Sequence, residues 1–122
     1  MARSAGTFGA RLDRALERWG GFLDELLATG RRVALWGAGS KGVTFLNLVE
    51  GGDRVDAVVD VNPRKHGLHV PGTGQAVVAP ETLGEDPVDV VLVMNPLYED
   101  EIRARLDGVG VAADVVTVTG ER

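Results

Sequence analysis

Apolar residues recur at intervals of three and four positions near the N-terminus. From residue 8 to residue 28 they are Phe8, Leu12, Ala15, Leu16, Trp19, Phe22, Leu23, Leu26 and Leu27. This spacing gathers apolar side chains on one face of an α-helix, and charged residues fill the opposite face. The pattern predicts an amphipathic helix that ends before Gly30, so we expect residues 1–30 to form a helical element ahead of the main domain.

After residue 30 the pattern changes to short apolar runs bounded by glycine, proline or polar residues. These runs lie at residues 32–36, 55–60, 76–78, 88–94 and 114–118. Nearly continuous apolar runs of this length are typical of strands that are buried on both faces. Segments with helical spacing or a helix-start signal lie between them, at residues 43–49, 80–83 and 98–106.

Strands that alternate with helices indicate a parallel sheet, because each parallel pair needs a crossover connection. The predicted fold class is therefore α/β: a small Rossmann-like three-layer domain with a mostly parallel sheet of four or five strands. We expect this Rossmann-like domain to cover residues 31–122, and the N-terminal amphipathic helix is an addition to it. We expect that helix to pack on one face of the sheet or to serve as a linker.

Composition narrows the class of protein. A chain of 122 residues, 44% hydrophobic and 25% charged, agrees with one globular domain. No apolar run approaches the roughly 18 residues that a membrane span needs. The N-terminal segment is charged and lacks the hydrophobic stretch of a secretory signal. We therefore expect a cytoplasmic protein that does not bind membranes.

The reactive and charged residues argue against several functions. The chain has no cysteine and two histidines, so we expect no disulfide, no metal site and no cysteine nucleophile. Thirteen basic residues against eighteen acidic ones give a net charge of −5, and the basic residues do not form a large cluster. Nucleic acid is therefore not an expected partner.

A glycine-rich hexapeptide follows the first predicted strand and opens the next predicted helix. In that context Gly37 allows a tight turn, Gly39 lets backbone N–H groups approach a phosphate, and Gly42 permits close packing of helix on strand. Ser40 and Lys41 add a hydroxyl and a cation at the helix N-terminus, where unpaired N–H groups favour an anion. The alternative is that the glycines serve only helix–strand packing.

Polar residues also follow the second long apolar run. Asp60 lies 18 residues after Gly42, where dinucleotide sites place an acid that accepts from ribose hydroxyls. It would equally cap the loop that begins at Asn62 through an Asx turn. Arg64 and Lys65 are candidates to meet a second phosphate, or are solvated loop residues.

The sequence offers fewer candidate site residues beyond those described above. Asn95 and Tyr98 follow the predicted strand at 88–94 and would line a crevice at the carboxyl end of the sheet, although Asn95 would also suit a simple turn. His66 and His69 would be the first candidates for a general base, but no nucleophile or paired carboxylate accompanies them. We expect no catalytic residue in this chain.

Four runs taken together carry a resemblance to a known family. They are VALWGAGSKG at residues 33–42, VDVNPRKHG at 59–67, VPGT at 70–73 and VAPE at 78–81. The chain resembles, from about Arg31 to Val118, the C-terminal domain of S-adenosylmethionine-dependent sugar C-methyltransferases. Members of that family have a zinc-binding N-terminal part, a central methyltransferase domain and a Rossmann-like C-terminal domain that helps to hold the nucleotide sugar. Only the third part has a counterpart here.

The resemblance implies a binding module that lacks the catalytic machinery. It implies that a nucleotide sugar contacts Ser40, Lys41, Asn62 and the loop of Pro71, Gly72 and Thr73. Methyl transfer would then need a methyltransferase domain or a partner chain, and no cofactor is assigned to this chain.

Two alternatives stay open. One is a stand-alone NAD-binding Rossmann domain of an oxidoreductase or redox sensor. The other is a structural domain that forms a homodimer through the apolar face of the N-terminal helix.

Overall fold

The computed structural model describes the backbone of residues 7–118 and the side chains of residues 13–118. The helices are α1 (Thr7–Ala28), α2 (Ser40–Leu48), α3 (Thr82–Glu85) and α4 (Glu99–Val109). The strands are β1 (Val33–Trp36), β2 (Ala57–Val59), β3 (Val77–Val78), β4 (Val90–Val93) and β5 (Asp114–Thr117). Short 3-10 helices follow α2, β2 and β4, namely η1 (Gly52–Arg54), η2 (Pro63–Lys65) and η3 (Pro96–Tyr98).

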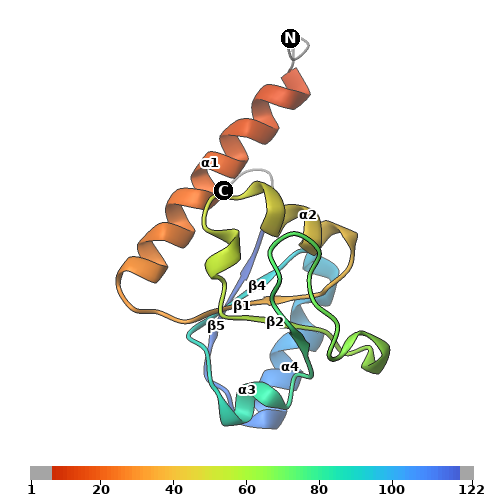
Figure 1. Cartoon of the computed structure of the whole chain (residues 1–122). Coiled ribbons are helices and arrows are strands. Elements are labelled where there is room, and N and C mark those ends of the chain that lie inside the picture. The colour runs from red at the N-terminus through yellow and green to blue at the C-terminus, as the bar shows by residue number, and fades with distance from the viewer. Residues whose placement is uncertain (1–6, 119–122) are drawn as a thin grey trace.

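The described strands form one parallel sheet with the order β3-β2-β1-β4-β5. Leu35 of β1 lies opposite Val58 of β2 on one side and Leu92 of β4 on the other. In chain order, the sheet therefore starts at its central strand β1 and continues outward through β2 and β3. The chain then returns to the other side of β1 to form β4 and β5 (Figure 1). The predicted Rossmann-like α/β fold is confirmed, and every pairing between the strands is parallel.

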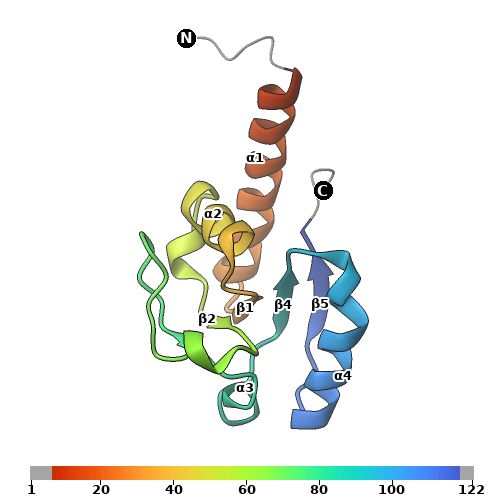
Figure 2. The same cartoon turned by 90° about the vertical axis from the view of Figure 1, so that its right-hand side faces the viewer.

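Helices cover both faces of the sheet and produce three layers (Figure 2). Val33 and Leu35 of β1 are buried on the face that α1 and α2 cover. Ala34 and Trp36, the alternate residues of the same strand, are buried on the other face with α3 and α4. Because β1 is buried on both faces, its sequence is apolar throughout, as the continuous apolar run predicts.

The amphipathic helix α1 packs on the sheet with the second half of its apolar face. Trp19, Leu23 and Leu26 are buried in the same core cluster as β1, and the Trp19 ring meets Phe45 of α2 edge-on at 6.4 Å between centroids. Figure 1 shows the first turns of α1 extending beyond the rest of the domain. The homodimer contact predicted for the apolar face of α1 uses Leu12, Leu16, Trp19, Leu23 and Leu26, and it stays a prediction. Trp19, Leu23 and Leu26 are already covered within this chain and Leu16 is partly buried against the same core, while the side chain of Leu12 lies outside the described residues.

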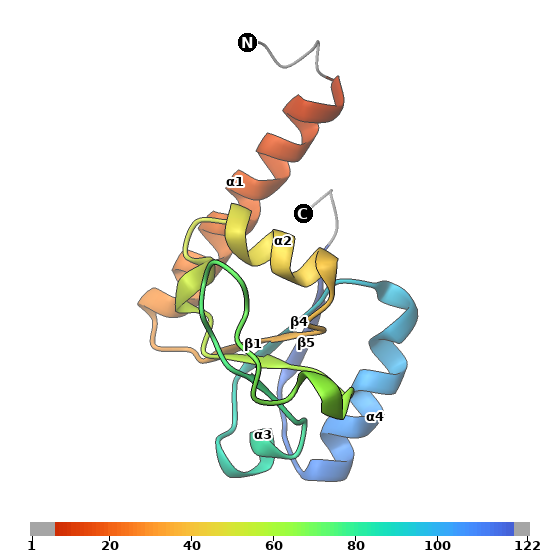
Figure 3. The same cartoon turned by 45° about the vertical axis from the view of Figure 1, so that its right-hand side comes forward.

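The region between η2 and β3 forms an ordered arm. Val70 donates its N–H to the carbonyl of Gln75 at 2.8 Å, and His69 forms an antiparallel bridge with Ala76. The base of this arm pairs with β3, where Val77 donates to the carbonyl of Leu68 at 2.8 Å. Figure 3 shows the arm rising beside α2.

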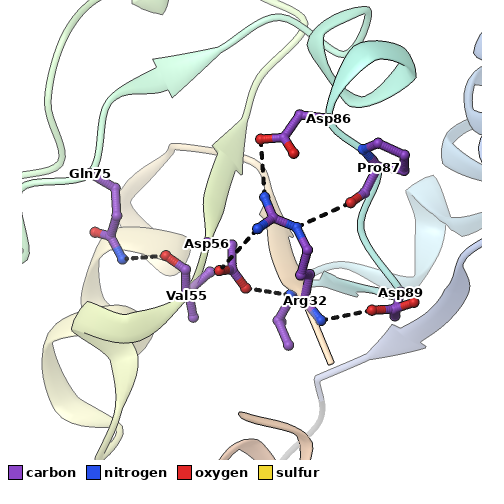
Figure 4. A network of polar contacts seen from close by, with 8 residues as sticks. Arg32, Val55, Asp56, Gln75, Asp86, Pro87 and Asp89 are labelled. Atoms are coloured by element: carbon purple, nitrogen blue, oxygen red, sulfur yellow. Dashed lines mark hydrogen bonds and ion pairs between the residues drawn. The ribbon is translucent and has the colours of Figure 1, made fainter. Parts of the chain in front are cut away.

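At the amino ends of the strands, a polar network surrounds Arg32 (Figure 4). The Arg32 guanidinium donates to Asp86 at 3.0 Å and to the carbonyl of Pro87 at 3.2 Å, and lies 3.9 Å from Asp56. The backbone N–H of Arg32 donates to the Asp89 carboxylate at 2.8 Å. These contacts tie the start of β1 to the segments that precede β2 and β4.

Candidate functional site

A cleft of about 570 Å³ opens at the carboxyl ends of β1, β2 and β4, between the N-termini of α2 and α4. This is the position where open α/β sheets bind ligands, because the chain leaves the central strands in opposite directions there. The cleft is lined by Trp36, Gly37, Gly39, Ser40, Lys41, Gly42, Asp60, Val61, Val93, Met94, Asn95, Tyr98, Glu101 and Ile102.

The three glycines of the turn between β1 and α2 have different reasons to be glycine. Gly37 has a φ of +111°, a conformation that side chains with a Cβ rarely adopt. A Cβ at Gly42 would overlap the carbonyl oxygen of Gly37 and press on Leu35. Gly39 has a φ of −83°, and a Cβ there would meet no atom within 4 Å. The fold therefore requires glycine at residues 37 and 42, whereas residue 39 borders open space in the cleft.

The N-terminus of α2 carries unpaired donors. Gly39 is the N-cap residue and provides no side-chain cap. Within the described part of the chain, the first-turn N–H groups of Ser40, Lys41 and Gly42 have no hydrogen-bond acceptor. The first turn contains no acidic residue, and the Lys41 side chain is exposed at the cleft. These features suit an anion such as a phosphate.

Asp60 joins the glycine turn to the loop after β2. One carboxylate oxygen accepts the N–H of Ala38 at 2.8 Å, and the other accepts the N–H of Asn62 at 2.8 Å. The second contact is the loop-capping role that the sequence suggested for Asp60. Each carboxylate oxygen has a further acceptor position, so these two bonds leave the ribose role of Asp60 untested.

The three residues that follow Asn62 and Pro63 occupy different environments. Lys65 donates from Nζ to the carbonyl of Ala38 at 3.3 Å. His66 places Nε2 2.6 Å from the Asp60 carbonyl, so Nε2 carries the donated hydrogen. Arg64 is exposed and its side chain has no hydrogen-bond or ion-pair partner among the described residues. None of the three lines the cleft.

Asn62 and Asn95 have the same local role after β2 and β4, the two strands that flank β1. Asn62 accepts the N–H of Arg64 at 3.0 Å and caps η2, while Asn95 accepts the N–H of Leu97 at 2.9 Å and caps η3. Both precede a proline at the first position of the 3-10 helix. Asn95 also lines the cleft with Tyr98, whereas Asn62 does not. The turn interpretation of Asn95 is confirmed, and its cleft position is compatible with a second role.

The loop of Pro71, Gly72 and Thr73 is the tip of the arm and does not line the cleft. Asn47 of α2 donates from Nδ2 to the Pro71 carbonyl at 2.9 Å, and a Cβ at Gly72 would overlap the Asn47 side chain. Thr73 donates its hydroxyl hydrogen to the side-chain oxygen of Gln75. The tip therefore packs on the outer side of α2, away from the other predicted site residues.

The sequence did not predict several of the residues that line the cleft. They are Trp36, Val61, Val93, Met94, Glu101 and Ile102. Most were recognised only as apolar residues of strands or of a helical stripe. Their place at the carboxyl ends of adjacent strands, and in the first turn of α4, was the available signal.

Glu99, a carboxyl group with a shifted pKa, lies beside the cleft and does not line it. The hydroxyl of Thr117 donates to Glu99 at 2.7 Å, and this bond lowers the pKa of the Glu99 carboxyl below its ordinary value of 4.5. Hydrogen bonds from the Arg103 guanidinium lower this pKa further, and desolvation opposes them. Glu99 therefore anchors the first turn of α4 to β5.

Metal binding and membrane insertion find no support in the described residues. In the part of the chain that the structure describes, no group of three or more His, Cys, Asp or Glu side chains is placed to hold a metal ion. No described helix combines the length and apolar character that crossing a bilayer requires.

Comparison with known proteins identifies related sequences and folds. The family model for the C-methyltransferase C-terminal domain matches residues 3–116. This match takes in α1, whereas the resemblance described above began at Arg31. Among solved structures, the crystal structure of RSP, a Rex-family repressor, is similar with a TM-score of 0.53 and 14% sequence identity, over 93% of this chain and 89% of that chain. At this identity the likeness concerns the fold alone. No curated protein matches the chain.

Proposed function

Since the chain belongs to the C-methyltransferase C-terminal domain family, we propose that it is a non-catalytic module that binds a nucleotide sugar in the cleft at the carboxyl end of the sheet. Methyl transfer is assigned to a methyltransferase domain on the same chain or on a partner chain. The proposal also places the module in the cytoplasm, where nucleotide sugars are available to such an enzyme.

The observation that carries the proposal is the geometry at Gly39. The fold accounts for Gly37 by its positive φ and for Gly42 by close packing, but it leaves space beside Gly39. That space adjoins the unpaired N–H groups at the start of α2 and the cation of Lys41. A phosphate of the ligand would accept from these groups.

The rest of the cleft suits the uncharged part of such a ligand. Trp36, Met94 and Tyr98 provide apolar and aromatic surface on which a base can pack. Asn95 and Glu101 also line the cleft and offer acceptors for sugar hydroxyls. A volume of about 570 Å³ is in the range of pockets for small molecules and cofactors.

The substitution Gly39→Ser tests the proposal. The backbone at Gly39 is already extended, with φ −83° and ψ −174°, as in helices that begin with a serine cap. The serine hydroxyl would accept the same N–H groups as the phosphate, so it would replace the anion. We expect the free energy of unfolding to change by only about a few tenths of a kcal/mol. We expect the affinity for thymidine diphosphate to fall at least about tenfold, because charge-assisted hydrogen bonds are lost.

The measurement is calorimetric titration with thymidine diphosphate, a thymidine diphosphate sugar, NAD and S-adenosylmethionine. Gly108→Ser is the matched control, because Gly108 lies in α4 with open space around it and does not line the cleft. Binding of the diphosphate ligands by the wild type and by Gly108→Ser, but not by Gly39→Ser, supports the proposal. Binding of NAD without any response to nucleoside diphosphates would instead favour the dinucleotide alternative.

A further inference from the structure

Lys65 lies beside the glycine turn and not in the cleft. Its Nζ donates to the carbonyl oxygen of Ala38 at 3.3 Å, in a partly buried position. Lys41 is the cation that lines the cleft within the described part of the chain, and Lys65 does not contribute to the lining. This placement differs from that of a side chain that reaches out to a second phosphate.

The loop after β2, which carries Lys65, also fixes the N–H group of Ala38. The N–H of Ala38 donates to Asp60 at 2.8 Å, and the peptide after Ala38 accepts from Lys65. Asp60 is itself fixed, because its second carboxylate oxygen accepts from Asn62 and its carbonyl meets His66 at 2.6 Å. The loop after β2 therefore holds both peptide groups that flank the Ala38 Cα.

The orientation of one peptide follows from these contacts. The described chain contains no cis peptide bond, so the carbonyl of Ala38 and the N–H of Gly39 point in opposite directions. Lys65 holds the carbonyl, and the N–H of Gly39 is consequently directed away from Lys65. That N–H has no acceptor among the described residues, and Gly39 lines the cleft.

We propose that Lys65 is a positioning residue that orients the Gly39 N–H toward the bound anion, and that it does not itself contact the ligand. The inference rests on the proposed function of the cleft. A cation on the carbonyl also polarises the peptide, which strengthens the opposite N–H as a donor. Lys65 and Asp60 then act as a pair that preorganises the anion site before a ligand arrives.

A comparison of a nucleoside monophosphate with a nucleoside diphosphate distinguishes a positioning role of Lys65 from a direct contact between Lys65 and the second phosphate. We expect Lys65→Met to weaken thymidine monophosphate and thymidine diphosphate by the same factor, about fivefold, since each loses one oriented donor. Lys65→Arg should restore both affinities to within about twofold, because its guanidinium can also donate to the carbonyl. Arg64→Met removes the same charge from the neighbouring exposed position and should leave both affinities within about twofold.

A nuclear magnetic resonance readout follows the oriented group itself. In the wild type, the Gly39 amide proton should move downfield when either nucleotide is added, and in Lys65→Met this movement should be largely lost. A loss of affinity confined to the diphosphate would overturn the inference in favour of a direct contact, and an unchanged affinity or an unchanged Gly39 response in Lys65→Met would also overturn it. Failure of the wild type to bind either nucleotide would instead contradict the proposed function of the cleft.

Discussion

Gly42 faces the carbonyl oxygen of Gly37 so closely that residue 42 has no room for a Cβ. The contact brings the first turn of α2 against the end of β1, and Leu35 closes the remaining side. Gly39, between them in sequence, has no such neighbour. Two glycines of one motif thus have opposite sensitivities to substitution.

The first prediction concerns the stability of the glycine turn. Gly42→Ala should lower the free energy of unfolding by about 1–3 kcal/mol, because the added methyl group forces α2 away from the strand. Gly39→Ala should cost less than about 1 kcal/mol, since its only penalty is a poorer N-cap residue. Urea unfolding of the two variants measures the difference. Equal losses would contradict the packing role of Gly42.

The second prediction concerns the charge at the cleft. Lys41→Met should weaken thymidine diphosphate about tenfold at low salt, because the exposed ammonium lies beside the proposed phosphate position. The difference from the wild type should shrink as sodium chloride is added, since salt screens exposed charges. Titrations at several salt concentrations measure both effects. A difference that is independent of salt would argue against an electrostatic contact.

The third prediction concerns the double acceptor Asp60. Asp60→Asn replaces one acceptor oxygen by an NH₂ group, so the N–H of Ala38 or that of Asn62 loses its partner. We expect a loss of about 1–2 kcal/mol in unfolding free energy together with weaker nucleotide binding. Asp53→Asn, at an exposed position in η1, provides the control with the same change of charge. A normal affinity in Asp60→Asn would show that the Ala38 peptide does not need this brace.

The fourth prediction concerns pH. The pKa of Glu99 is lowered in the folded protein, chiefly by the Thr117 hydroxyl and then by Arg103. Its contribution to stability is therefore complete above the ordinary pKa of 4.5 and is lost as the pH falls below that value through the lowered pKa. Thr117→Val should reduce the stability difference between neutral and acidic solution. Urea unfolding from about pH 6 to about pH 3 tests this, and identical pH profiles would contradict it.

Local patterns in the sequence predicted much of this fold. The strand, glycine turn and helix at residues 33–48 are adjacent in the chain, and their periodicity and glycine positions suffice to predict them. The same holds for β4 and α4. The order of the strands in the sheet could not be predicted in this way, because nothing in the apolar runs determines that β4 returns to the free side of β1.

The site was less predictable, because its contacts join distant segments. Asp60 reaches Ala38 across 22 positions, and this contact exists only because β2 pairs with β1. Glu101 enters the cleft only through the position of α4, so its charge alone carried no signal. The loop at residues 71–73 came from the family resemblance, and the contact with Asn47 that holds it beside α2 depends on the arm as a whole.

The fifth prediction concerns the amino end of the sheet. Arg32→Met removes the donors to Asp86 and to the Pro87 carbonyl, but Arg32 is about half exposed, so we expect a loss of only about 1 kcal/mol. Nucleotide affinity should not change, because the cleft lies at the opposite ends of the strands. Unfolding and titration experiments on one sample check both statements. A reduced affinity would show that the two ends of the sheet are coupled.

The arm beside α2 also limits how this protein can associate. Its base pairs with Val77 and so covers the outer side of β3. An unpaired strand edge is where a strand of another chain can be added. At Val77 that position is already taken by the chain's own arm, so a second copy cannot pair directly with β3 there.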